Sequence, residues 1–541
     1  MERLGQAGQE REAAIAGSLN ERQSIKQTED VMRTLLSALA ALSLMAVGIA
    51  PGIAAKAIKN TTITISLGSD LETMDPHTNT SALTTTIHRY LFDTLMHRPN
   101  SADLAPWAAK EVIHVDAKTL EFRMREGVKF SNGEDVDAQA VQFSLTRPLQ
   151  PGFKTVLGPL FRVVDRVEVV SKWVVRVHMK STDPGLLRRL ADYGHLVPPK
   201  YYAGLSQEDA AVKPVGSGPY RLSRWQKGVE IVFEANPDYW KADAPHVKTV
   251  RVVPIKEDGT KVAALLKGEV ELVNQVPAQY LPKLKSSADT RVEIVRGTRV
   301  FHVGFTHGID SPLKDIRVRK AVAHALDRNV IVKHVVEGYG IVANQPLHEW
   351  TEGYDAKFAW PYNFDPKKSR QLLAEAGYPN GLEIDFVSPE GRYTKDKEVA
   401  QAVVGMLQSA GIRVKHQSVV WNRFVEMFNA RRNPGAKPFI YYIGYGNGTG
   451  DSDAALSAIA ACKGAWSGYC NPDVDKALDE AASTMDSRKR SAIFREITQK
   501  MADDVSHAML WQEDSVYGMR KGVVWSVRND DRVYAWELDR R

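Results

Sequence analysis

The alternation of strand and helix patterns in the second half of the chain restricts its fold more than any other sequence feature. Residues 382–388, 412–420 and 438–446 contain many β-branched and aromatic residues and are predicted to form strands. Helical patterns occur between and around these runs. Because strands that alternate with helices usually pair in parallel through crossover helices, we predict an α/β fold for this region.

Helix start signals support this prediction. Asp315, Asp365 and Asn471 each precede a helical pattern and can accept hydrogen bonds from the free N–H groups of the first turn. Pro366 and Pro472 follow at the first helical position, where a missing N–H costs nothing. We therefore expect three helices to begin at these points.

The first half of the chain is richer in strands. Residues 61–68 alternate apolar and polar side chains and predict a first strand. Residues 163–179 contain two alternating runs around a turn, which predicts a hairpin, and Asp137 is placed to cap a helix. The chain thus divides into a mixed, strand-rich first part and a more regular α/β second part.

Residues 32–57 have the order of features of a signal peptide. Arg33 precedes an apolar run over residues 35–50, and a helix-breaking Pro-Gly pair and small residues follow. Cleavage after Ala55 or Ala57 fits this pattern. The alternative is a membrane anchor, but the run is shorter than the roughly 20 residues that span a bilayer.

Residues 1–31 are polar and show no apolar periodicity. Met32 is a better start for the signal than Met1, in which case residues 1–31 lie upstream of the true start. No Cys follows the apolar run, so we expect no lipid anchor at the new N-terminus. The prediction is an exported protein, soluble in the periplasm.

The chain has two Cys residues, Cys462 and Cys470, close together in a Gly-containing loop. In an oxidising compartment this arrangement favours a disulfide, and two free buried thiols are the alternative. The spacing matches no common zinc motif.

Charge and motifs weigh against several other classes. A formal charge of +6 is small for 541 residues, and the basic clusters are short, so we expect no nucleic-acid partner. The sequence lacks the Gly-x-Ser-x-Gly motif of serine hydrolases and the His-Glu-x-x-His motif of metalloproteases. Its 14 His are scattered. We therefore predict a protein that is not an enzyme, with no catalytic residue, metal site or cofactor.

Four sequence blocks identify a family. They occupy residues 125–145, 215–240, 311–328 and 364–384, and include the segments VGSGPYRLSRW and FDPKKSRQLLAEAGYPNGLEI. In these blocks the chain resembles the extracellular solute-binding proteins of the peptide/nickel class, bacterial solute-binding protein family 5. The resemblance covers nearly everything after the signal peptide.

The resemblance implies an α/β fold in the form of a two-lobe periplasmic-binding-protein clamp, type II of the peptide-binding-protein class, with an extra strand-rich subdomain in the first lobe. We place lobe I at residues 58–305, with the subdomain at about 85–215. Lobe II then spans 306–511, and residues 512–541 return to lobe I. The lobes would close about a hinge around a ligand.

The same resemblance implies the function. The expected protein is a monomeric receptor of an ABC importer that captures a small solute and delivers it to the membrane permease subunits. The solute would be peptide-like, opine-like or sugar-conjugated. A nickel-complex receptor and a chemosensory binding protein remain as alternatives.

Two segments match positions that line the cleft in this family. Asp70 and Glu72 follow the first strand and either contact the ligand or cap a turn. Trp421 and Phe424 lie three residues apart and either form an aromatic wall beside the ligand or belong to the core.

The segment from Tyr445 to Gly448 is the third match. Relatives that bind peptides carry an aromatic residue here, followed by an Asp that holds the ligand's ammonium group. Tyr445 takes the aromatic position, whereas the Asp position falls on Gly448. A buried cation needs a partner charge, so an ordinary dipeptide is disfavoured unless Asp451 or Asp453 replaces the missing acid. Together with Gly446 and Asn447, this loop would suit a polar, hydroxyl-rich or anionic solute.

Overall fold

The structure is a computed structural model that describes residues 58–68, 70–100, 102–307 and 310–541. The predicted N-terminal extension (1–31) and signal peptide (32–57) lie outside these residues. None of the helices described in these ranges is long and apolar enough to cross a membrane.

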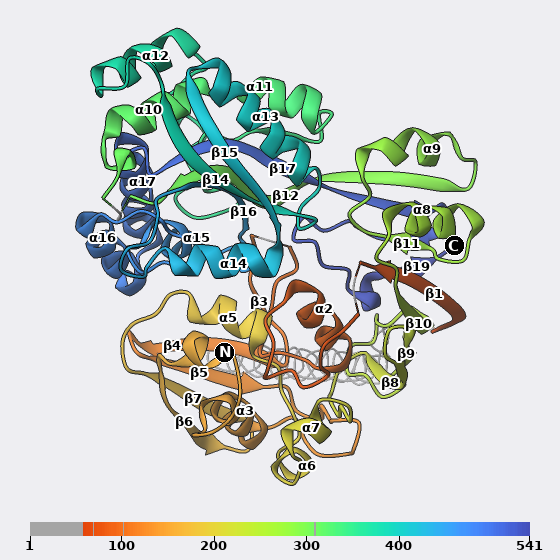
Figure 1. The fold of residues 1–541 in the computed structure, drawn as a ribbon. Helices are drawn as coiled ribbons and strands as arrows, with labels where there is room; N and C mark the ends of the chain where they lie inside the picture. The colour runs from red at the N-terminus through yellow and green to blue at the C-terminus, as the bar shows by residue number, and fades with distance from the viewer. Residues whose placement is uncertain (1–57, 69, 101, 308–309) are drawn as a thin grey trace, which may run out of the picture. The chain divides into compact units, whose positions relative to one another are not determined.

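The described residues form one large mixed sheet of eleven strands (Figure 1). In spatial order its strands are β15 (Ile412–Val420), β14 (Leu382–Glu390), β16 (Ile440–Gly446), β12 (Thr290–Phe305), β17 (His507–Arg520), β11 (Leu272–Val273), β1 (Lys59–Leu67), β10 (Val247–Pro254), β9 (Glu230–Ala235) and β8 (Tyr220–Gln226), with β13 (Gly340–Val342) paired to β17.

The α/β prediction for the second half is confirmed. Strand β14 pairs in parallel with both β15 and β16. Helices α13 (Asp396–Ser409) and α14 (Trp421–Ala430) form the crossovers between these strands. The sheet as a whole is mixed, because β16 continues it through antiparallel pairing with β12.

Two long strands join the halves of this sheet. Strands β12 and β17 pair in antiparallel fashion from Thr290 opposite Arg520 to Gly304 opposite His507. At one end β17 pairs with β11, and at the other end β12 pairs with β16. The register shifts between Arg296 and Val300, and such an irregularity bends a strand and redirects its side chains.

A second sheet in the first half has four antiparallel strands and its own apolar core. Its order is β4 (Ala109–Asp116), β5 (Thr119–Met124), β7 (Val174–Met179) and β6 (Val164–Ser171), so the predicted hairpin is confirmed. Helices α3 (Ala138–Thr146) and α5 (Leu186–Tyr193) contribute to this core. Asp137 caps α3 through the N–H groups of Gln139 and Ala140.

The predicted helix starts of the second half are also confirmed. Asp315, Asp365 and Asn471 accept backbone hydrogen bonds at the first turns of α10 (Ile316–Ala325), α12 (Pro366–Glu375) and α16 (Pro472–Ser483). Shorter and flanking elements are α2 (Ala82–Leu91), α4 (Gly158–Phe161), α6 (Pro199–Ala203), α7 (Gln207–Ala210), α8 (Asp258–Lys267), α9 (Leu281–Ser286), α11 (Arg328–Val330), α15 (Ser452–Ala460), α17 (Ser487–Asp503), β2 (Met96–His97), β3 (Ala105–Pro106), β18 (Val523–Val524) and β19 (Asp539–Arg540).

The C-terminal segment returns to the first half of the chain. Strand β17 leads into residues 521–541, whose aromatic side chains Tyr534 and Trp536 pack in the same core as Ile65 of β1. Buried ion pairs hold this segment, since Arg532 contacts Asp192 of α5 at 2.7 Å. The lobe boundaries at 58–305, 306–511 and 512–541 stay predictions.

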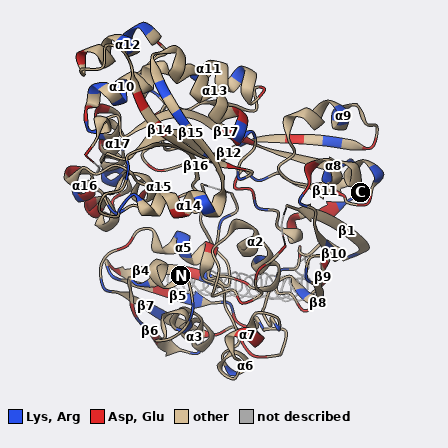
Figure 2. Cartoon of the chain, viewed as in Figure 1, with Lys and Arg blue, Asp and Glu red and all other residues tan. Residues whose placement is uncertain are grey.

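Lys and Arg are interspersed with Asp and Glu along the elements of both halves (Figure 2). This distribution agrees with the small formal charge of +6.

The predicted disulfide between Cys462 and Cys470 is confirmed. The loop that it closes presents backbone carbonyls to the guanidinium of Arg431, which lies 2.7 Å from the oxygen of Ser467 and 3.3 Å from that of Gly464. The crosslink therefore closes a loop that is also held by hydrogen bonds.

Replacing both Cys462 and Cys470 by Ser should lower the free energy of unfolding by about 2.5 kcal/mol, because the crosslink removes the closure entropy of a short loop from the unfolded chain. Thermal and urea denaturation of the double variant would measure this loss. An unchanged stability that is also insensitive to reductant would contradict it.

Candidate functional site

The carboxyl ends of the parallel strands β14, β15 and β16 place three segments at one edge of the sheet. Arg392 follows β14, Trp421 follows β15, and Tyr445 is the penultimate residue of β16. The side chains meet there, since the Arg392 guanidinium lies 5.1 Å from the centre of the Trp421 ring. Ligands of open α/β sheets commonly bind beyond this edge.

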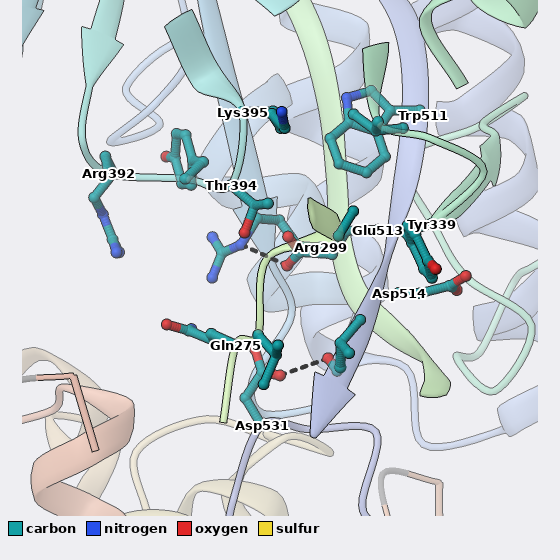
Figure 3. Close-up of a pocket in the computed structure, with 16 residues that line it drawn as sticks. Gln275, Arg299, Tyr339, Arg392, Thr394, Lys395, Trp511, Glu513, Asp514 and Asp531 are labelled. Atoms are coloured by element: carbon teal, nitrogen blue, oxygen red, sulfur yellow. Dashed lines mark hydrogen bonds and ion pairs between the residues drawn. The ribbon is translucent and has the colours of Figure 1, made fainter. Parts of the chain in front are cut away.

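A pocket lies between this edge and the joining strands (Figure 3). It encloses about 70 Å³, space for roughly five water molecules. Its lining residues are Gln275, Val276, Ala278, Arg299, Val336, Tyr339, Arg392, Tyr393, Thr394, Lys395, Trp511, Glu513, Asp514, Ser515, Val516 and Asp531. Residues from β12, β17, the loop after β14 and the C-terminal segment therefore share one site.

Backbone conformation also marks this pocket. Five described residues other than Gly have a left-handed backbone, and three of them, Gln275 (φ 51°), Lys395 (φ 59°) and Asp531 (φ 59°), line the pocket. The left-handed conformation costs about 1–2 kcal/mol for such residues. Strain of this kind is concentrated at functional sites, which supports a ligand-binding role for this pocket.

Arg299 and Glu513 form a partly buried ion pair across β12 and β17, with Nε 2.9 Å from Oε1 (Figure 3). Arg299 also donates to the carbonyl oxygen of Gly444 at 3.1 Å. Burial and the neighbouring Asp531 together raise the pKa of Glu513 to about 7, against the opposing effect of Arg299. A Cβ atom at Gly446 would lie 3.2 Å from the guanidinium, so this glycine lets the strand approach Arg299.

Asp531 accepts a hydrogen bond from the Ser515 hydroxyl at 2.5 Å. Burial raises the pKa of its carboxyl, and Arg299 opposes the increase. Other charges of the pocket have closer partners. Asp514 pairs with Arg296 at 2.6 Å.

Lys395 is likewise paired, with Glu337 at 3.4 Å and Glu398 at 3.9 Å. Arg392 differs, because within the described ranges its guanidinium has neither an ion pair nor a hydrogen bond. It stacks instead near Tyr393 and Trp421, at 5.3 and 5.1 Å from the ring centres. Burial lowers its pKa, and Arg299 lowers it further. An arginine with free donors at a pocket suits an anionic group of a ligand.

The first two predicted site residues make local contacts. The Asp70 carboxylate accepts hydrogen bonds from the N–H groups of Leu71 at 2.7 Å and Gly228 at 2.5 Å. Glu72 accepts one from the Asn79 amide at 2.6 Å. This geometry agrees with the turn-capping alternative, and a ligand contact for either residue stays a prediction.

Trp421 and Phe424 stack on each other with ring centres 5.5 Å apart. Phe424 is fully buried in a core cluster, as in the second alternative for this pair. Trp421 is partly exposed and contacts the pocket residue Arg392. The structure thus brings Trp421 to the site, with Phe424 behind it.

The segment from Tyr445 to Gly448 is not part of the pocket lining, although Gly446 lies against the lining residue Arg299, and a ligand contact for this segment stays a prediction. The Tyr445 hydroxyl donates to the carbonyl of Ala454 at 3.3 Å, and Asn447 is 4% exposed with its side-chain N–H₂ lacking a protein partner among the described residues. A Cβ atom at Gly448 would meet no described atom within 4 Å. The position of the missing acid is therefore open space.

Two acids follow Gly448 and could replace the missing one, but Asp451 already has an ion-pair partner. Asp451 caps α15 and pairs with Arg490 at 3.1 Å. Burial raises the pKa of Asp453 to about 6. Asp451 also meets the first half of the chain, because a Cβ atom at Gly185, the residue before α5, would lie 2.4 Å from its carboxylate.

Sequence reasoning missed Arg299, Arg392, Glu513 and Asp531. One signal for Arg392 was available, since this residue directly follows a predicted strand of the parallel sheet. Asp531 carries no comparable signal, because its place at the pocket depends on the return of the C-terminal segment. No group of three or more His, Cys, Asp or Glu side chains with metal-binding geometry occurs in the described part of the chain.

Comparisons with known proteins agree with this fold. A family model described as bacterial extracellular solute-binding proteins, family 5 Middle, matches residues 103–467. The glutathione-binding protein GsiB of Pectobacterium atrosepticum is 26% identical over 486 residues, which cover 87% of this chain and 93% of that protein.

Two solved structures have a similar fold. The periplasmic binding protein DppA of Helicobacter pylori, in complex with the peptide STSA, has a TM-score of 0.75 at 22% identity, covering 89% of this chain and 98% of that one. AgaA of Agrobacterium tumefaciens, in complex with agropinic acid, has a TM-score of 0.75 at 21% identity, covering 89% and 99%. The fold is thus the two-lobe clamp of periplasmic binding proteins, and the chain belongs to the bacterial extracellular solute-binding proteins of family 5.

Replacing Glu513 by Gln should change the pH dependence of stability. The folded-state pKa of Glu513, about 7, lies above its ordinary value of 4.5, so the ionised carboxylate costs stability at high pH and this cost disappears as the pH falls toward 4.5. Relative to the wild type, Glu513→Gln should be most stable at pH 8 and lose about 2–3 kcal/mol of that advantage by pH 5.

Denaturation of both proteins at a series of pH values would measure this difference. An offset between Glu513→Gln and the wild type that stays constant from pH 8 to pH 5 would contradict the assignment.

Proposed function

We propose that this protein is the periplasmic receptor of an ABC importer and captures a small solute bearing an anionic group between two lobes. The observation that carries the proposal is the unpaired Arg392 guanidinium at a strained pocket between the joining strands and the edge of the parallel sheet. A charge-assisted hydrogen bond to a carboxylate would satisfy this group.

The named ligands of similar proteins support this class of solute. Glutathione, the peptide STSA and agropinic acid all carry carboxylate groups, and they are associated with GsiB, DppA and AgaA respectively. We propose that a peptide-like or opine-like carboxylate is the solute of this chain, and that it is delivered unaltered to the permease rather than converted.

The remaining parts of the proposal follow from the sequence. The signal-peptide pattern at residues 32–57 supports export to the periplasm, and the lack of a Cys directly after it supports a mature protein without a lipid anchor at its N-terminus. A receptor of this kind needs a hinge, and the paired strands β12 and β17 with their register shift near Arg299 are suited to that role.

Replacing Arg392 by Gln should weaken binding of a carboxylate solute ten- to hundredfold, because it removes the charge-assisted hydrogen bonds and retains most of the side-chain bulk. Isothermal titration with glutathione, Ala-Phe and agropinate would measure the loss. The exposed Arg423 supplies a control, since Arg423→Gln removes the same charge away from the pocket. Equal affinities of all three proteins would overturn the anion site.

Replacing Gly185 by Val should prevent full closure of the lobes. The added carbon would lie 2.4 Å from the Asp451 carboxylate, whereas the Gly185 backbone (φ −78°) tolerates any residue. We expect at least a tenfold loss of affinity at a steric clash of this kind.

Small-angle X-ray scattering with and without solute would test closure directly. Gly185→Val should keep the same radius of gyration in both conditions, whereas the wild type should contract. Gly204→Val is the matched control, because its added carbon is 3.8 Å from the nearest atom. A contraction of Gly185→Val equal to that of the wild type would show that the lobes do not meet at this point.

A further inference from the structure

The charged side chains that line the pocket balance, with Arg299, Arg392 and Lys395 against Glu513, Asp514 and Asp531. Arg299 faces two of these carboxylates, Glu513 at 2.9 Å and Asp531, whose pKa it also influences. A partly buried carboxylate is stabilised by a cationic partner, and one guanidinium is a direct partner to only one of the two.

The two carboxylates are not equivalent. Glu513 has Arg299 as a direct ion-pair partner, whereas the Asp531 carboxylate accepts a hydrogen bond from the neutral Ser515 hydroxyl. Figure 3 shows Asp531 at the lower end of the pocket, on the C-terminal segment, with Gln275 beside it. Asp531 therefore lacks an ion-pair partner in the described part of the chain and is the acidic group that can pair with a cationic group of a ligand.

Arg392 is the complementary group on the other side of the pocket. Internal pairing accounts for the remaining charges, with Asp514 bound to Arg296 and Lys395 bound to Glu337. After this pairing, one cation and one anion are left without an ion-pair partner among the described lining residues. Their separation on different elements fits a ligand that carries both charges.

We infer that Asp531 binds a cationic group of the solute, so that the pocket selects zwitterions with an ammonium or guanidinium group at Asp531 and an anionic group at Arg392. This inference rests on the proposed receptor function and deepens it. It assigns the cation site to the C-terminal segment instead of the loop at Gly448, where no acid is present.

Other acids near the pocket are less suited to this role. Asp451 pairs with Arg490 and caps α15. Asp514 is neutralised by Arg296. Asp531 further carries a left-handed backbone at the pocket, and short polar residues such as Asp and Asn tolerate this conformation best. The backbone conformation at residue 531 therefore favours a short polar residue.

The test compares matched solutes that differ by one charge. The first pair is Ala-Phe and N-acetyl-Ala-Phe, and the second is glutathione and its derivative acetylated on the free amine. For each pair that binds, we expect the wild-type protein to bind the solute with the free amine at least about tenfold more tightly than the acetylated solute, as for a hydrogen bond to a charged group. Asp531→Asn should reduce this preference to less than about threefold.

The substitution is chosen to preserve the fold. Asn adopts the left-handed backbone of residue 531 as readily as Asp. Asp531→Gly is a second variant, because Gly also removes the carboxylate and readily adopts a positive φ. Asp479→Asn, at an exposed position of α16 outside the pocket lining, is the control for loss of a negative charge, and it should retain the preference. Thermal melting would verify that each variant is folded.

Equal binding of amine and acetylated solutes by the wild type would overturn the inference, as would a preference that persists in both Asp531 variants. Failure of the wild type to bind any of these four solutes would also overturn it. Binding of a purely anionic solute that depends on Arg392 would then leave the receptor function standing, so the two failures are distinguishable.

Discussion

The antiparallel pairing of β12 with β17 is the interaction on which the rest of this structure depends. These strands join the two halves of an eleven-stranded sheet of the described residues, and their register shifts near Arg299. The same strands carry the partly buried Arg299–Glu513 pair into the pocket. Any change in the angle between the halves must therefore move these charges relative to Arg392, which couples the shape of the protein to the chemistry of its site.

Several features of this pocket reduce the stability of the unliganded protein. The pocket combines three left-handed residues with two acids, Glu513 and Asp531, whose pKa values are raised by burial. Such features reduce stability and persist where the surrounding fold enforces them. A solute with complementary charges would relieve this cost on binding, so part of its affinity would come from unfavourable interactions already present in the unliganded protein.

Much of the fold could be predicted from the sequence, because its signals are local. The caps Asp315, Asp365 and Asn471, the hairpin at 163–179 and the parallel strands after residue 380 all depend on neighbouring residues. The site was harder, because Arg299, Glu513 and Asp531 come together only through the pairing of distant strands. Local spacing was also insufficient for Trp421 and Phe424. A separation of three residues along a helix does not reveal which of the two rings faces the core, and the structure shows that it is Phe424.

The central claim is that two lobes enclose a small solute and release it unchanged. Native mass spectrometry of the full-length protein, expressed with export and incubated with a library of peptides, opines and sugar conjugates, tests it most directly. The account predicts a noncovalent complex of one protein with one solute, whose mass after release equals that of the free compound. A spectrum that stays free of solute across the library, or a released compound of altered mass, would contradict it.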